Sequence, residues 1–351
     1  MKLRTAINYS LSLLLGLVFI WLTFKGIDFE GLKAAFGHVS WWYLLLYLVI
    51  LTGIQIVRTT RWGVMLEPVK KVPFRTLYAV SSVGFMALVL LPFRLGEFAR
   101  PILIHEKGGV HMSAAMATVV VERVLDAITI SVLLMVTIII LASGGFQVPD
   151  WLVNSGVIFF LVFFSMLVVC IFMYLRPALI EKVTGVMLGW ASPAIKEKAN
   201  NILHQFINGL KILPDWKRLL NIFVQSMIYW GLNATGLYVM FIACDLRDVR
   251  TGEMLPYIAA YALLCMQVVG ISIPSGPAFT GPFDYFTAIT VSMFAGMTHS
   301  APAVQLYVIL VHGLQLAQQS LFGLVYVLTG YVSFGSLVRR SGDMEEFVEP
   351  T

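Results

Sequence analysis

The chain has 351 residues, of which 59% are hydrophobic and only 12% are charged, whereas about a quarter of the residues in a soluble domain are charged. This composition excludes a water-soluble globular domain, and the net charge of +5 fits membrane topology and anionic lipid rather than nucleic acid. The three cysteines, Cys170, Cys244 and Cys265, lack paired spacing, so we expect neither a disulfide nor a metal site.

Apolar runs along the chain are long enough to cross a hydrocarbon core of about 30 Å, which takes about 20 helical residues. The first run, Ile7–Phe24, has no small-x-small cleavage site before Lys25, so we interpret it as a retained helix rather than a signal peptide. We therefore predict an all-α integral membrane protein. The later runs without Asp, Glu, Lys or Arg are Trp41–Val57, Thr76–Phe93, Ala127–Val148, Trp151–Leu175, Leu219–Cys244, Leu255–Pro282 with Tyr285–Thr298, and Ala301–Val338.

Lysine and arginine are enriched in cytoplasmic loops, so their distribution assigns a side to each loop. The segments Gly144–Asp150 and Cys244–Glu253 are poor in basic charge, and we expect them, with Asp150 and Arg247, outside. We expect the protein in the cytoplasmic (inner) membrane, with both termini in the cytoplasm. The basic residues that mark the cytoplasmic side are Lys2, Arg4, Arg58, Arg61, Lys70, Lys71, Arg75, Arg176, Lys182, Lys196, Lys198, Lys211, Lys217, Arg218, Arg339 and Arg340.

These side assignments predict two re-entrant hairpins. Residues 76–111 must enter and leave on the cytoplasmic side, and residues 255–299 must do so on the outer side. Each segment carries a Pro/Gly motif near its middle, Leu91-Pro-Phe-Arg-Leu-Gly-Glu97 and Ile273-Pro-Ser-Gly-Pro-Ala-Phe-Thr-Gly-Pro282. Non-helical backbone at membrane depth is tolerated where it is buried in protein or lines a wet cavity.

The order of elements then repeats with inverted topology. Residues 1–142 read helix, helix, hairpin, helix from inside to outside, and residues 143–338 repeat that order from outside to inside, followed by a cytoplasmic tail at 339–351. Such repeats are typical of alternating-access transporters, whose broken segments meet near the midplane. The alternative is eight plain helices that break the charge rule once or twice.

Residues 178–213 are neither apolar enough to span the membrane nor polar enough to be disordered. Their apolar residues follow helical spacing opposite lysines and asparagines, which indicates an amphipathic helix in the headgroup region. A cytoplasmic helix packed on the bundle is an equal alternative. The apolar positions are Ile195, Ala199, Ile202, Phe206 and Leu210.

Six ionisable residues lie close to the first hairpin: Arg94, Glu97 and Arg100 follow Pro92, and Glu122, Arg123 and Asp126 interrupt the next helix. Charged groups at membrane depth usually face a bundle interior and mark a pathway. A helix beginning at Gly96 adds a positive field, so we interpret Arg94 and Arg100 as a clamp for an anionic headgroup. The alternative is that these two arginines pair with Glu122 and Asp126 and hold the fold.

In the second half, Asp284 is the only Asp, Glu, Lys or Arg between Glu253 and Arg339. It is expected either to cap the return arm of the hairpin or to couple a cation or proton. On the last helix a polar stripe that recurs every seven residues predicts a cavity-facing surface, with interhelical hydrogen bonding as the alternative. The stripe comprises Gln305, His312, Gln319 and Tyr326, and Gln315 lies one turn from both His312 and Gln319.

Enzyme signatures are mostly missing from the sequence. It contains neither GxxxxGK[ST] nor H-E-x-x-H, and its six histidines are dispersed, so we expect no ATP-driven mechanism, no metal and no cofactor. The longest polar stretch is too short for a soluble catalytic domain of about 100 residues. We therefore expect a transporter rather than an enzyme.

Three motifs carry a family resemblance: Arg58-x-x-Arg61-Trp62, Pro92-x-Arg94-x-Gly96-Glu97-x-x-Arg100 and Val120-Val-Glu-Arg123-x-x-Asp126. Together they resemble the lysylphosphatidylglycerol synthase transmembrane-domain family, also called flippase-like, over nearly the whole chain. The late motif Gly281-Pro-Phe-Asp284 is similar to that of the family, which usually ends in Glu. We expect a stand-alone member without the synthase domain.

The resemblance implies lipid translocation without specifying the lipid. In the bifunctional multiple peptide resistance factors this module is thought to flip aminoacylated phosphatidylglycerol, and stand-alone relatives are associated with polyprenyl-phosphate sugars. The leading hypothesis is therefore a flippase for an anionic phospholipid or a lipid-linked headgroup. The expected substrate-binding residues are Arg58, Arg61, Arg94, Glu97, Arg100, Glu122, Arg123, Asp126, Asp284, His312, Gln315 and Gln319.

Two other functions stay open on the sequence alone. One is an intramembrane lipid-modifying transferase that uses Glu97, Glu122 or Asp126 as a base. The other is a non-transporting membrane partner of a separate lipid-modifying enzyme. In each case the expected ligand is an anionic lipid or a lipid-linked sugar, with no nucleic acid.

Overall fold

The computed structural model describes residues 14, 16–90, 96–145, 150–187, 193–213, 215–273 and 275–332. This part of the chain is helical throughout, with one isolated bridge between Arg247 and Met254, so the predicted all-α class is confirmed. Residues 16–24 form the first described helix. The others are α2 (Phe29–Gly37), α3 (Trp41–Leu66), α4 (Phe74–Leu90), α5 (Gly96–Gly108), α6 (Met112–Ser143), α7 (Asp150–Leu175), α8 (Pro177–Met187), α9 (Pro193–Gly209), η2 (Leu210–Ile212), α10 (Trp216–Ala243), α11 (Tyr257–Ser272), η3 (Pro277–Phe279), α12 (Pro282–Ala295) and α13 (Pro302–Leu328).

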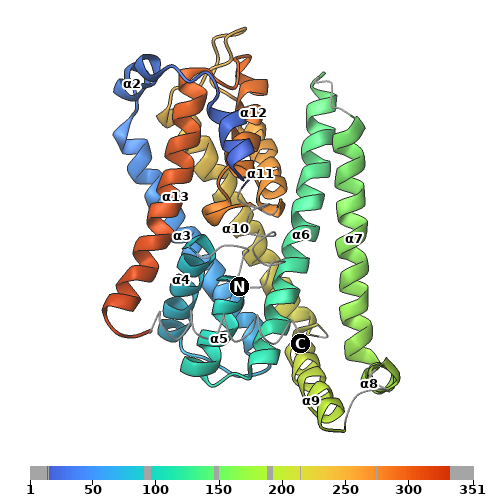
Figure 1. The fold of residues 1–351 in the computed structure, drawn as a ribbon. Helices are drawn as coiled ribbons and strands as arrows, with labels where there is room; N and C mark the ends of the chain where they lie inside the picture. The colour runs from blue at the N-terminus through green and yellow to red at the C-terminus, as the bar shows by residue number, and fades with distance from the viewer. Residues whose placement is uncertain are drawn as a thin grey trace.

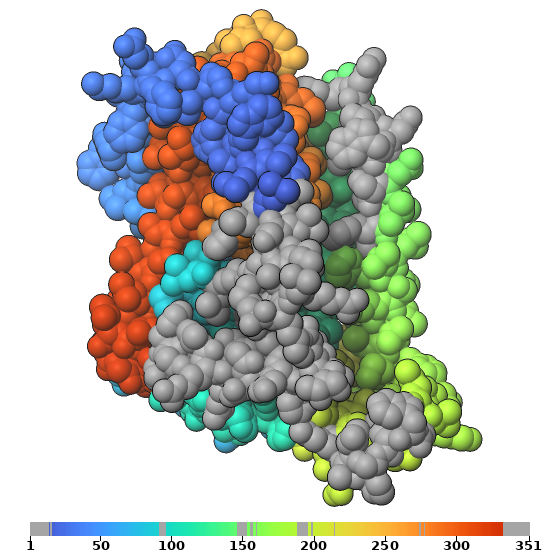
Figure 2. Space-filling view, viewed as in Figure 1, coloured from blue at the N-terminus to red at the C-terminus, as the bar shows by residue number. Residues whose placement is uncertain are grey.

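Four of the described helices, α3, α6, α10 and α13, are long and apolar enough to cross a membrane. The bent pair formed by Phe160–Leu175 of α7 and by α8 turns through 100° and is a fifth candidate span. Pro177 at the bend cannot continue the hydrogen bonding of the preceding helix. Helix α7 stands at the edge of the molecule (Figures 1 and 2), and its exposed apolar side chains include Leu161, Val162 and Val169. The chain is a multi-pass membrane protein.

Two pairs of short helices form the hairpins. Helices α4 and α5, with 17 and 13 residues, and α11 and α12, with 16 and 14 residues, pack against their partners. At 1.5 Å per residue each arm is about 20–26 Å long, shorter than a hydrocarbon core of about 30 Å. The first hairpin lies in the lower half of Figure 1 and the second in the upper half, so they enter from opposite ends. Both predicted hairpins are present as packed pairs of short helices, although the turn of the first, residues 91–95, lies outside the described residues. Their re-entry from the cytoplasmic and outer sides stays a prediction.

Glycine lets the arms of each hairpin approach closely. A side chain at Gly96 would collide with the backbone of Ala87 and Leu88 in the opposite arm, and one at Gly270 would crowd the backbone of Pro282 and Phe283. The same device therefore closes both hairpins, because only a residue without Cβ permits such backbone contact.

The helix contacts follow an inverted repeat, in which α3 to α6 correspond to α10 to α13. Helix α3 packs on its counterpart α10. Helix α4 packs on α13 as α11 packs on α6, and α5 packs on α6 as α12 packs on α13. These contacts of one half thus have equivalents in the other, while the chain runs in opposite directions (Figure 1). The domain boundaries near residues 142 and 338 stay predictions.

Two expectations on helix ends have different outcomes. The apolar run that was expected to end at Val57 continues as α3 to Leu66, so the placement of Arg58 and Arg61 in a cytoplasmic loop was wrong, and both lie inside a helix. Arg61 pairs with Asp126 inside the bundle, so its charge does not have to lie in a loop exposed to water. The helix expected to begin near Met112 does begin there, and it carries Glu122 and Asp126 buried on one face.

The segment after α7 packs on the bundle through α9 and η2, and its expected place in the headgroup region or in the cytoplasm stays a prediction. Helix α9 contacts α6, and Gly209 lies so close to Ala114 and Ala117 that a side chain there would collide with both. Leu210 and Ile212 of η2 are buried. These contacts join the segment to the core of the lower half, which also contains Trp62, Leu103 and Ile222.

Candidate functional site

A cluster of buried charged side chains connects α3, α5 and α6, and we call it the arginine cluster. At its centre, Arg61 donates two hydrogen bonds to Asp126, Nη1 to Oδ1 at 2.6 Å and Nη2 to Oδ2 at 2.9 Å. Arg61 Nη1 also donates to the hydroxyl of Ser226 on α10 at 3.1 Å. The side chain of Arg61 is 1% exposed. This two-pronged pairing uses the planar fork of the guanidinium group, which a lysine cannot reproduce.

Glu122 is the point at which three arginines meet. Arg100 donates to it through Nη2 at 2.9 Å and Nη1 at 3.3 Å, and Arg61 approaches Oε1 at 3.4 Å. Arg123 Nη2 also donates to Oε1. The carboxylate of Glu122 is fully buried, so its negative charge is stabilised by these guanidinium groups rather than by water.

Aromatic rings also contact the arginines of the cluster. The guanidinium carbon of Arg58 lies 3.0 Å from the ring centre of Phe85, and that of Arg100 lies 5.0 Å from the same ring. Arg100 also lies over the ring of Trp62 at 4.2 Å. Such cation–π contacts are stronger where water is excluded. The Nε1–H of Trp62 donates to Thr118 at 3.1 Å, which fixes the ring.

Helical spacing explains how the sequence builds this cluster. Arg58 and Arg61 are three residues apart and share one face of α3, and Glu122 and Asp126 are four residues apart and share one face of α6. Arg61 can therefore contact both carboxylates. Gly84 makes room for the side chain of Arg100, since a Cβ at Gly84 would collide with its Cγ.

The cluster holds more positive than negative charge in the part of the chain that the structure describes. Its four arginines, 58, 61, 100 and 123, face Glu122 and Asp126, and Glu97 interacts electrostatically with Arg123. Among these described side chains the Nε atoms of Arg58, Arg61 and Arg100 are buried without a hydrogen-bond partner. Arg123 differs from its neighbours because 43% of its side chain is exposed.

The predicted clamp residues have different outcomes. Arg94 lies outside the described residues. Arg100 is 3% exposed, and its two terminal nitrogens bind Glu122, so it makes the internal pair that was the alternative to a clamp. Among the described residues Asp126 pairs with Arg61 of α3 and with Arg123, and whether Arg94 also pairs with a carboxylate stays a prediction. A role of these residues in substrate binding stays a prediction.

A second polar site joins the second hairpin to α13. Asp284 accepts a hydrogen bond from the backbone N–H of Gly281 at 2.9 Å and so caps α12. Its other oxygen lies 2.6 Å from Nδ1 of His312. Nε2 of His312 lies 3.0 Å from the carbonyl oxygen of Ala278, in the turn between α11 and α12. We call these groups the Asp–His pair.

The rest of the polar stripe on α13 makes contacts between elements. Gln315 donates to the hydroxyl of Tyr47 at 2.9 Å, and the buried Gln305 donates to the carbonyl of Thr23 at 2.7 Å. Gln319 is partly buried. The bonds of Gln305 and Gln315 match the alternative of interhelical hydrogen bonding rather than a cavity-facing surface.

Several supporting residues were missed by sequence reasoning. Gln55 accepts from Arg58 Nη2 at 2.7 Å, and Ser226, Trp62 and Phe85 contact the arginines. A signal for Gln55 was present, since it precedes Arg58 by one helical turn. Nothing in the sequence pointed to Ser226, which is 165 residues from Arg61.

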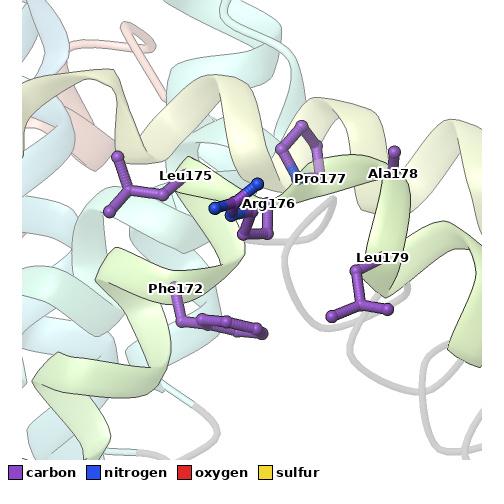
Figure 3. Close-up of a pocket in the computed structure, with 6 residues that line it drawn as sticks. All are labelled: Phe172, Leu175, Arg176, Pro177, Ala178 and Leu179. Carbon is purple, nitrogen blue, oxygen red and sulfur yellow. The ribbon is translucent and has the colours of Figure 1, made fainter.

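A cavity of about 480 Å³ lies at the bend between α7 and α8, away from both polar sites (Figure 3). Arg176 is its one charged lining residue, and the others are Phe172, Leu175, Pro177, Ala178 and Leu179. Its apolar wall with a single cation suits a surface that meets lipid.

Comparison with known proteins places the chain among membrane proteins. The model of the family described as "Lysylphosphatidylglycerol synthase TM region" matches residues 9–323. A protein described as "UPF0104 membrane protein" from Methanothermobacter thermautotrophicus is 26% identical over 276 residues, which cover 74% of this chain and 78% of that protein. No solved structure matches.

Proposed function

Because the chain belongs to the lysylphosphatidylglycerol synthase TM region family, we propose that it moves an anionic lipid between the leaflets of the cytoplasmic membrane. The substrate is an anionic phospholipid or a lipid-linked headgroup such as a polyprenyl phosphate. The observation that carries this proposal is the arginine cluster, whose described side chains have an excess of positive charge inside the bundle. A phosphate group is the kind of ligand that such an excess favours.

The excess of positive charge in the arginine cluster is the reason for proposing an anionic substrate. An unneutralised cation at membrane depth is costly, so residues of this kind generally face a pathway for a charged substrate. Arg123 is the described member of the cluster with a largely accessible side chain, at 43%. Its Nη2 is bound to Glu122, but a guanidinium group has five N–H donors, so it retains donors for phosphate oxygens. We therefore assign Arg123 the first contact with the headgroup.

The hairpins support a transport role for the fold. Two broken segments enter from opposite ends of the bundle, as in transporters whose substrate site lies between inverted repeats. In the second hairpin the turn at Pro277–Phe279 is not α-helical, and such backbone at membrane depth needs protein or water around it. Lys70, Lys71 and Lys217 lie in or beside the loops at the α4–α5 end, and by the positive-inside rule we assign that end to the cytoplasm.

The cluster is less suited to a transferase. A catalytic base needs a free lone pair directed at the substrate. Glu122 is occupied by three guanidinium groups, and both oxygens of Asp126 are bound by Arg61. These contacts favour transport over an intramembrane reaction that uses either carboxylate as a base.

Purified protein in liposomes tests the proposal against both alternatives. Phosphatidylglycerol with a fluorescent headgroup is placed in the vesicles, and a membrane-impermeant quencher then reports how much lipid has changed leaflet. Transport predicts faster loss of protected fluorescence than in empty vesicles, with lipid unchanged by thin-layer chromatography. A new lipid product would instead support a transferase, and neither movement nor product would support a partner protein. A lipid-linked polyprenyl phosphate is the second substrate to assay.

A further inference from the structure

Both ring nitrogens of His312 face oxygen atoms. Nδ1 lies 2.6 Å from a carboxylate oxygen of Asp284, and Nε2 lies 3.0 Å from the carbonyl oxygen of Ala278. A neutral imidazole has one N–H and one bare nitrogen. Because a carbonyl oxygen cannot donate, the hydrogen bond to Ala278 requires a proton on Nε2.

The contact with Asp284 then requires a second proton. Either Nδ1 also carries a hydrogen and donates it to the ionised carboxylate, or a protonated Asp284 donates to bare Nδ1. In both cases the pair contains one proton more than a neutral imidazole with an ionised carboxylate. The observed geometry is therefore that of a loaded proton site.

The site is shielded from water. The side chains of His312 and Asp284 are 10% and 7% exposed, and the ring of Phe283 lies 4.6 Å from the imidazole. Gly281 occupies the second carboxylate oxygen through its backbone N–H. An unpaired charge in such surroundings is expensive, so the contact between the two side chains stabilises both of them.

No other ion pair of Asp284 is present within the described residues. The elements that pack on the second hairpin and on α13 also carry charged residues. They are Glu30 and Lys33 of α2, Arg58 and Arg61 of α3, Arg75 of α4, Glu122, Arg123 and Asp126 of α6, and Lys217 and Arg218 of α10. The uncharged titratable groups on these elements and on the hairpin are Tyr43, Tyr47, Tyr78, Tyr229, Tyr238, Tyr257, Tyr261, Cys265, Tyr285, Tyr307 and Tyr326.

The turn held by His312 is strained. Ala278 and Phe279 have φ values of 60° and 59°, in the left-handed region that is unfavourable for a residue with a side chain. The hydrogen bond from Nε2 holds the carbonyl of Ala278 in this conformation. A strained turn persists only where its surroundings determine it, so the proton on Nε2 is part of what keeps it.

We propose that Asp284 and His312 share one proton in this conformation and that the Nε2–H of His312 holds the turn at residues 277–281. Without hydrogen on Nε2, its lone pair would face the lone pairs of the Ala278 carbonyl, and the turn would lose this hydrogen bond. No redox step or other reactant is involved, and the site does not depend on lipid movement.

Histidine spectroscopy tests the first half of the proposal. The protein, labelled with ¹⁵N-histidine, is placed in nanodiscs of phosphatidylcholine and phosphatidylglycerol, and the signal lost in His312→Gln identifies the residue. If the shared proton resides on the imidazole, His312 is expected to have hydrogen on both nitrogens. If the proton instead resides on the carboxylate, an infrared carboxylic-acid band is expected that Asp284→Asn removes. A bare ring nitrogen on His312 with no such band in the parent protein overturns the proposal.

Hydrogen exchange tests the second half. His312→Phe keeps a ring against Phe283 but removes both donors, so amide exchange at residues 278–281 is expected to accelerate at least tenfold at constant pH. His204→Phe on α9 is the matched control and should leave these amides unchanged. His312→Leu provides a second variant if His312→Phe does not fold, with the same expected acceleration. Unchanged exchange in the folded variants would show that the turn does not depend on the pair.

Discussion

The two halves of the bundle have the same helix order but different polar chemistry. In the first half, four arginines and two carboxylates meet between α3, α5 and α6. In the second half, one aspartate and one histidine meet between α12 and α13. The repeat therefore fixes the backbone, while each half places its own ionisable groups beside its hairpin. A many-membered cluster and a single pair should respond differently to the loss of one charge.

Replacing one charged residue should lower the stability of the protein more in the first half than in the second. Arg61→Ala removes both hydrogen bonds to Asp126 and leaves this buried carboxylate with only the longer contact to Nη2 of Arg123, at 3.6 Å, so we expect a cost of about 3–5 kcal/mol. Thermal unfolding in detergent should show a larger fall in stability for Arg61→Ala than for Glu122→Gln or Asp284→Asn. Arg247→Ala, in an exposed loop pair with Asp245, is the matched control and should unfold like the parent.

A double variant separates an unpaired charge from lost packing. Arg61→Ala combined with Asp126→Ala leaves neither charge alone, so the two single effects should not add, with a coupling of about 1–3 kcal/mol. Strict additivity of the two losses would mean that the ion pair does not hold α3 against α6.

Glu122→Gln is the next largest expected effect. The amide keeps the shape of the side chain but removes the charge that faces three guanidinium groups, so we expect a loss of about 2–4 kcal/mol. Denaturation of the purified variant measures it. A variant as stable as the parent would indicate that the arginines are neutralised mainly by other groups.

Asp284→Asn should cost less, because it removes one charge from a pair rather than from a cluster. The asparagine oxygen can still accept from Gly281, and the lost charge-assisted contact to His312 corresponds to about 1.5–3 kcal/mol. Unfolding of Asp284→Asn and Glu122→Gln, measured side by side, checks the order. A greater loss for Asp284→Asn would reverse the comparison between the halves.

The smallest effects are expected at the two ends of the bundle. Single cysteines at Lys70 and Arg247, both on the surface, should change stability by less than about 0.5 kcal/mol. In intact cells a membrane-impermeant maleimide should label the Arg247 position, whereas the Lys70 position should require permeabilised cells. Labelling of both from the same side would contradict the proposed orientation.

The sequence predicts the membrane spans and both hairpins because their signals are local. Apolar length and loop charge fix the crossings, and the motifs around Pro92 and Pro282 mark the breaks. The same reasoning placed Arg61 in a loop, because the first charged residue after an apolar run was taken as the end of the membrane helix. Its neutralisation by Asp126, 65 residues away, depends on packing between helices and so is not visible in a local window.

Site residues were easier to identify than their partners. Asp284 and His312 both stood out as polar residues in apolar helices, yet nothing in the sequence joined them across 28 residues. Their contact follows from the turn at Ala278, whose left-handed conformation a composition rule does not predict. Arg100 stood out in the same way, but its pairing with Glu122 follows from the close approach at Gly84.

The most direct test of the proposed transport is the rate at which labelled phosphatidylglycerol changes leaflet in liposomes that contain Arg123→Ala. This residue is 43% exposed, and Glu122 keeps Arg61 and Arg100 as partners without it, so its loss should cost less stability than Arg61→Ala. Loss of a charge-assisted phosphate contact should slow lipid movement about tenfold or more, with Arg247→Ala at the parent rate. Arg123→Ala that moves lipid as fast as the parent, at equal amounts of folded protein, would contradict the assignment of the arginine cluster to the headgroup.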